Sequence, residues 1–137
     1  IILEANMAHK IQAINAYRPR IEQGNTVQKD ELVRELSHAT SLVEGSISLT
    51  LTELKFRLIG YLRAGRAVKV EGLGIWTPAI SLDGTFSVIY RPDMRISYEL
   101  NQPSVFTGTV LNRENVGKTS EELIILWNKE NPDDQID

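Results

Sequence analysis

The spacing of apolar residues changes near Gly65, and this change constrains the fold of the chain more than any other feature of the sequence. Before it, apolar residues recur at helical steps of three and four, at Ile47, Leu51, Leu54, Leu58 and Leu62. After it, "AVKV", "GIWTPAISL" and "TFSVIY" follow the two-residue period of a strand. We therefore expect a helical layer followed by a small antiparallel sheet, which makes the chain an α+β protein.

Two helices are predicted ahead of the sheet. The first, "TVQKDELVRELSHA", starts with Thr26 as its N-cap. The second, longer helix follows "SLVE", in which Ser41 begins the spacing of a capping box. It should end near Ala64, because Gly65 suits the left-handed position that follows many helices.

The remaining elements are read from turn residues and from a further cap. The dipeptide Asp83-Gly84 is a hairpin signal between two of the alternating segments. Pro92 interrupts the pattern, and "MRISYEL" then alternates again, so we expect three or so antiparallel strands. A final helix is predicted for "TSEELIILWNKE", which opens with the capping box of Thr119 and Glu122.

These elements predict one domain at residues 26–129, with a segment on either side of it. Residues 1–25 are an N-terminal extension, in which "HKIQAINAY" fits either a strand or a helical turn. Residues 130–137 are expected to be a solvated acidic tail. Six acids and one lysine give residues 121–137 a charge of −5, which leaves +2 for residues 1–120 out of the total of −3.

Gly72 and Gly74 allow two interpretations. A dinucleotide-binding loop uses such glycines to approach a pyrophosphate, but it needs a third glycine and a following helix. Here strand-like residues follow, which favours a tight bend between strands. In that case Leu73 and Trp76 are expected to pack against the helical layer.

Composition excludes several classes of site. The chain has no cysteine and two histidines, so we expect no disulfide and no metal site. The longest apolar run, "LIILW", is far too short to span a membrane. No nucleophile motif or phosphate-binding loop is present. We therefore expect no enzymatic activity, no catalytic residue, no cofactor and no small-molecule substrate.

The segment "LRAGRAVKVEGLGIW" carries a family resemblance. Together with the two preceding helices, from about Val27 to Trp76, it resembles the bacterial HU and integration host factor family of DNA-bending proteins. Leu73 stands where that family has an aromatic residue. The ending "GKTSEELIILWNKENPDD" is similar to divergent HU-like proteins of Bacteroidetes. The resemblance implies an HU-like fold, in which a helical hairpin precedes the sheet, and a homodimer whose helices form a common base.

The chain departs from that family at the DNA-binding arm. Family members carry an R-N-P-x-T-G segment at the arm tip, and no such motif occurs here. Arg91-Pro92 and Arg95 are its only counterparts. A shortened arm is therefore expected, and the resemblance no longer implies kinking of DNA by an inserted proline.

The resemblance makes six residues candidates for DNA contact: Lys69, Arg91, Pro92, Arg95, Arg63 and Arg66. Each also has a plainer interpretation, as a solvated strand face, a blunted sheet edge or a helix-terminal charge. The leading hypothesis is a cytoplasmic, nucleoid-associated protein that binds the duplex DNA backbone weakly and without base readout. The alternative is a dimerisation or protein-interaction module of the same fold, which the acidic pI of about 5.4 favours.

Overall fold

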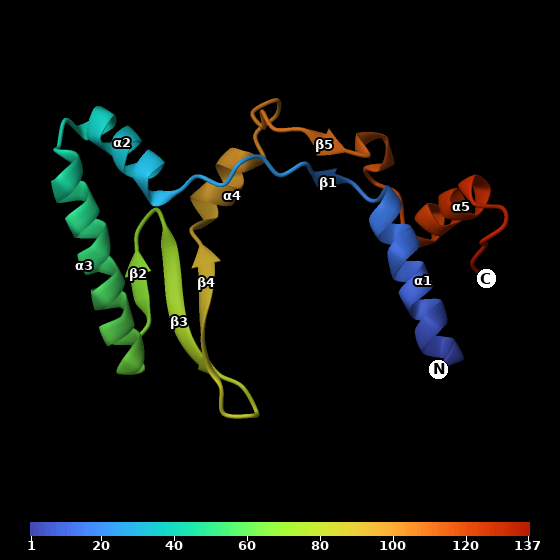
Figure 1. Ribbon diagram of the computed structural model, residues 1–137, viewed down its shortest axis with the longest axis horizontal. Helices are drawn as coiled ribbons and strands as arrows, with labels where there is room; N and C mark the ends of the chain where they lie inside the picture. The colour runs from blue at the N-terminus through green and yellow to red at the C-terminus, as the bar shows by residue number, and fades with distance from the viewer. The chain divides into compact units, whose positions relative to one another are not determined.

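The computed structural model describes residues 1–137 and divides into two units (Figure 1). Unit 1 combines residues 1–24 with residues 108–137, and unit 2 comprises residues 25–107. The predicted domain start at 26 lies beside this division. At the other end of the predicted domain, residues 108–129 group with residues 1–24 in unit 1.

Unit 2 begins with the predicted pair of helices, α2 (Lys29–Thr40) and α3 (Glu44–Arg63). They pack on each other and bury Val33 and Ile47 at their contact. The predicted N-cap at Thr26 is wrong, because α2 starts after Gln28, two residues later, without a side-chain cap. Helix α3 ends as predicted, and Gly65 takes the left-handed conformation with φ of +77°.

The capping box predicted at Ser41 is wrong. Ser41 itself adopts a left-handed conformation and ends α2, and its backbone N–H donates to the carbonyl of Ser37. The Ser37 hydroxyl donates to the carbonyl of Leu42, which braces the short connection between the helices. Helix α3 then begins after Val43 without a side-chain cap.

The sheet of unit 2 is antiparallel, in the order β2 (Val68–Val70), β3 (Gly74–Ile80) and β4 (Phe86–Pro92). The predicted hairpin turn at Asp83-Gly84 is confirmed. The Ser81 N–H donates to the Thr85 carbonyl at 3.0 Å, and the Asp83 carboxylate accepts from the Thr85 N–H at 2.9 Å. The Asp83 carboxylate also accepts from the Ser81 hydroxyl. The bonds from Ser81 and Thr85 lower the pKa of Asp83 to about 2, and the bond from Ser81 has the larger effect.

The strand predicted at "MRISYEL" is wrong, because these residues form the short helix α4 (Met94–Leu100). The Asp93 carboxylate accepts from the N–H of Arg95 at 2.9 Å and caps the helix. An aspartate directly after Pro92 is a helix-start signal, and it outweighs an alternation that lasts for only seven residues.

Unit 1 is assembled from the two ends of the chain. Helix α1 (Ile2–Tyr17) packs on α5 (Ser120–Glu130), and β1 (Arg20–Ile21) pairs with β5 (Val110–Leu111), which the 3₁₀ helix η1 (Arg113–Asn115) follows. Ala13 and Leu123 are buried. The predicted cap of α5 is confirmed, since the Thr119 hydroxyl accepts from the N–H of Glu122 at 3.2 Å.

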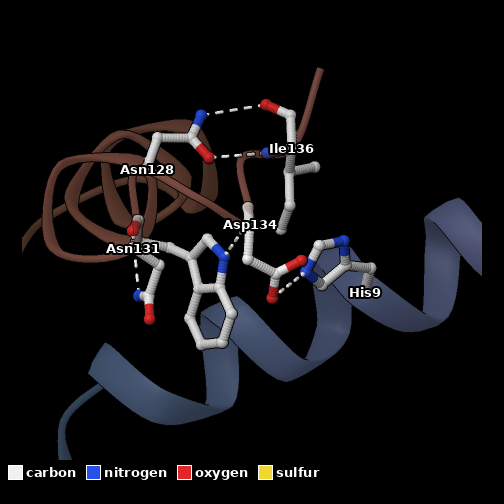
Figure 2. A network of polar contacts seen from close by, with 6 residues as sticks. His9, Asn128, Asn131, Asp134 and Ile136 are labelled. Carbon is white, nitrogen blue, oxygen red and sulfur yellow. Dashed lines mark hydrogen bonds and ion pairs between the residues drawn. The ribbon is translucent and has the colours of Figure 1, made fainter.

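The residues after α5 are mostly exposed coil, as the sequence predicts, but hydrogen bonds hold them against α5 and α1 (Figure 2). Asn128 holds both backbone groups of Ile136, with its carbonyl oxygen 2.6 Å from the Ile136 nitrogen and its amide nitrogen 2.9 Å from the Ile136 oxygen. The Trp127 indole N–H donates to the carbonyl of Asp134 at 2.8 Å. His9 Nε2 lies 3.2 Å from the Asp134 carboxylate. Ile136 is consequently only 5% exposed.

None of the helices combines the length and the hydropathy that a membrane span requires.

Candidate nucleic-acid interface

Lys69 and Arg91 lie in one row across the sheet of unit 2. The strand register pairs Lys69 with Ile75 and Ile75 with Arg91, so the three residues share one face. At the spacing of neighbouring strands, the two cations stand about 10 Å apart along this row. Both side chains are exposed.

The row faces away from the helices of unit 2. Strand β2 contacts α3, and Val68 and Val70, which flank Lys69, are half-buried. Because successive side chains of a strand point to opposite faces, Lys69 points to solvent, as the sequence predicts. We call the exposed face that contains Lys69, Ile75 and Arg91 the outer sheet face.

Pro92 and Arg95 follow the row at the end of β4. Pro92 closes the strand opposite Gly74, and Arg95 lies in the first turn of α4 with its side chain exposed. Between them, Asp93 is committed to the backbone, since its carboxylate accepts from the N–H groups of Arg95 and Gly72. The acid beside these two candidates therefore serves the local fold.

Arg63 and Arg66 belong to a different part of unit 2. Arg63 is in the last turn of α3 and lines an apolar groove, and Arg66 lies over the Tyr61 ring, 5.2 Å from its centroid. The structure therefore does not bring these two arginines into the row of Lys69 and Arg91. None of the five candidate cations forms a salt bridge.

The two glycines serve a bend. Gly72 and Gly74 have φ of +87° and +144°, and a Cβ at Gly74 would collide with the carbonyl oxygen of Arg91. The N–H of Gly72 donates to the Asp93 carboxylate at 3.3 Å, so an internal anion is its partner. The bend interpretation is confirmed.

Of the two side chains that the sequence predicts to pack against the helices, Leu73 differs from the prediction. Leu73 is 49% exposed and does not pack against the helices. Leu73 stabilises the bend through its backbone. Its carbonyl accepts from the Tyr90 hydroxyl at 2.8 Å and from the Asp93 N–H at 3.0 Å. Trp76 is half-buried, and its ring lies 5.0 Å from that of Tyr90. Tyr90 and Asp93 thus fix the bend, and only the helix-cap position of Asp93 carried a sequence signal.

Unit 2 also presents a large apolar surface. A groove of about 740 Å³ opens between α3 and the distal half of the β3–β4 hairpin. Its apolar lining consists mainly of Ile59, Leu62, Pro78, Ile80, Phe86 and Val88. Every residue of β4 is exposed. A single copy of unit 2 therefore leaves much of its potential core uncovered.

Charge is divided unequally between the two units. Unit 2 contains nine basic and nine acidic residues, so its net charge is zero. Unit 1 contains six basic and nine acidic residues and carries the whole charge of −3. The outer sheet face therefore belongs to the unit without net negative charge.

A family model described as "HU domain fused to wHTH, Ig, or Glycine-rich motif" matches residues 3–87, which is more than half of the chain. The match includes α2, α3, the Gly72–Gly74 bend and the hairpin turn. A comparison with curated proteins gave no match. At the level of the family, the HU domain is a non-enzymatic DNA-binding domain. The chain belongs to this family of HU-domain proteins.

Proposed function

We propose that the chain is an HU-like architectural protein of the bacterial nucleoid, which binds the backbone of duplex DNA without reading bases. The observation that carries the proposal is the row of Lys69 and Arg91 on the outer sheet face of an HU-family unit. Both cations lack an acidic partner and are free to neutralise phosphates. Arg95 extends the same contact from the start of α4.

The β3–β4 hairpin supports contact at its base and not at its tip. No lysine or arginine occurs between Thr77 and Tyr90. The tip instead carries Asp83, which is ionised at neutral pH. An anion there repels phosphate, so we infer that the hairpin does not grip the DNA as a long arm does.

A homodimer belongs to this proposal. The apolar groove beside α3 and the exposed strand β4 would leave a monomer with an extensive apolar surface. A second copy, related by a two-fold axis, would cover such surface and would add a second row of cations. Four to six neutralised phosphates would then give a slope of log K against log salt of about −4 to −5, at about −0.9 for each phosphate.

Fluorescence anisotropy with a random-sequence duplex tests the proposal. The wild-type chain is titrated at several salt concentrations beside the double variant Lys69→Gln/Arg91→Gln. The variant should bind more weakly on every sequence, with a flatter salt slope. Lys55→Gln/Arg57→Gln is the matched control, because it removes two exposed cations from α3, away from the outer sheet face. Equal losses in both variants would contradict the proposed face.

The second candidate is an interaction module of the same fold. It is favoured by the zero net charge of unit 2 together with its exposed apolar groove. This candidate replaces the first if the wild-type chain shows no salt-sensitive binding at 50 mM salt and tens of micromolar protein, conditions under which about four phosphate contacts are detectable.

A further inference from the structure

Strand β4 is an unprotected sheet edge. It is hydrogen-bonded to β3 on one side only, and all seven of its residues are exposed. The opposite edge of the hairpin is different. There β2 covers the first part of β3, and Pro78, which has no N–H, stands in the uncovered part. Proline is a common device against unwanted strand pairing, and on β4 it occurs only at the last residue, Pro92.

The ladder of the hairpin determines which backbone groups of β4 face outward. The Ser81 N–H donates to the Thr85 carbonyl, and bonded pairs alternate with non-bonded pairs from there along an antiparallel ladder. The amides of Phe86, Val88 and Tyr90 therefore point away from β3. No other segment accepts from them.

We propose that β4 pairs in antiparallel fashion with β4 of a second copy of the chain, about a two-fold axis at Ile89. In this register Val88 faces Tyr90 of the second copy and exchanges both backbone hydrogen bonds with it. Phe86 faces Pro92, at the end of the strand, where the carbonyl of Pro92 can accept although its nitrogen cannot donate.

The register is self-complementary in charge and in polarity. Arg91 is the only charged residue of β4, and it faces Ser87 of the second copy, so no like charges meet. Ile89 faces Ile89 of the second copy, and Val88 faces the aromatic ring of Tyr90. An extended peptide of another protein would also form hydrogen bonds with the free backbone groups of β4. A second copy is favoured because this strand already complements itself.

The pairing would have a direct consequence for the outer sheet face. Residues directly opposite in an antiparallel pair lie on the same face of the sheet. The rows of Lys69 and Arg91 from both copies would therefore share one continuous surface, with the helices of both copies on the other side. The inference rests on the proposed homodimer and specifies the strand through which the copies meet.

Single cysteines test this register, because the chain has no cysteine of its own. In Ile89→Cys, the two cysteines form a non-hydrogen-bonded pair with Cα atoms about 4.5 Å apart, within the range of a disulfide. In the matched control Ser87→Cys, the cysteines are offset by four residues, or about 13 Å. Mild oxidation should give a covalent dimer of the first variant at least tenfold faster than of the second.

Sedimentation of the wild-type chain separates this inference from the proposed homodimer. A dimer in which Ile89→Cys cross-links no faster than Ser87→Cys overturns the β4 pairing and leaves the homodimer standing. A monomer at tens of micromolar overturns both, and assigns the edge to a peptide of another protein. DNA binding is measured separately, by the anisotropy titration of the Lys69 and Arg91 variants.

Discussion

The hydroxyl of Tyr90 donates a 2.8 Å hydrogen bond to the carbonyl of Leu73, and this bond fastens β4 to the Gly72–Gly74 bend. The same carbonyl accepts from the N–H of Asp93. The bend precedes Ile75, which stands between Lys69 and Arg91 in the proposed DNA-contacting row. The position of the row therefore depends on a few hydrogen bonds at its edge.

Tyr90→Phe removes this bond and keeps the ring that lies against Trp76. We expect unit 2 to lose about 1 kcal/mol of stability, the usual contribution of one such hydrogen bond. Denaturant unfolding followed by circular dichroism measures the loss. Tyr98→Phe is the control, because the exposed Tyr98 hydroxyl makes no hydrogen bond. Equal stabilities of the two variants would contradict a role of the Tyr90 hydroxyl in the fold.

Gly74→Val should be among the most destabilising single changes in unit 2. The side chain meets the carbonyl of Arg91, and φ of +144° is costly for any residue with a Cβ, at about 1–3 kcal/mol before the collision is counted. Thermal unfolding checks this expectation. Gly45→Ala, at an open position within α3, should be neutral or slightly stabilising.

The hairpin tip should lose stability in acid. The pKa of Asp83 is lowered from 3.8 to about 2 by its bonds to Ser81 and Thr85, so the unfolded chain binds a proton more readily than the folded one. The stabilisation is complete above pH 3.8 and disappears as the pH falls through about 2. The difference in melting temperature between wild type and Asp83→Ala should therefore shrink between pH 4 and pH 2. A difference that stays constant over this range would contradict the assignment.

Asn128→Ala should release the end of the chain from α5. It removes both hydrogen bonds to Ile136, in a partly buried setting where such losses cost about 1–3 kcal/mol. Hydrogen exchange of a C-terminal peptide, read by mass spectrometry, should accelerate. Gln135→Ala, which alters an exposed side chain of the same segment, should leave the exchange unchanged.

Local signals in the sequence predicted local structure well. Gly65 ends a helix, Asp83-Gly84 forms a turn, and Thr119 caps α5, because each depends on residues within a few positions of itself. The wrong prediction of a capping box at Ser41 also depends on residues within a few positions. Serine suits both a helix start and a short connection, and the bond from Ser37 to Leu42 decided in favour of the connection.

Long-range contacts could not be predicted in this way. His9 and Asp134 are 125 residues apart in sequence, and nothing near either residue indicates the other. The contacts that hold the mostly exposed C-terminal tail were missed for this reason, and its acidic composition gives no sign that Ile136 is buried. Of the candidate site, the alternation around Lys69 predicted its face correctly, but only the strand register brought Arg91 into the same row.

The assembly of unit 1 from both ends of the chain also sets an order of events during synthesis. Helix α1 leaves the ribosome about 100 residues before its partner α5. At about 5–20 residues per second, α1 waits for about 5–20 s, while all of unit 2 emerges and can fold. Ala13, which the assembled unit 1 buries, is open to chaperones throughout this interval, and unit 1 completes its fold only after unit 2 has emerged.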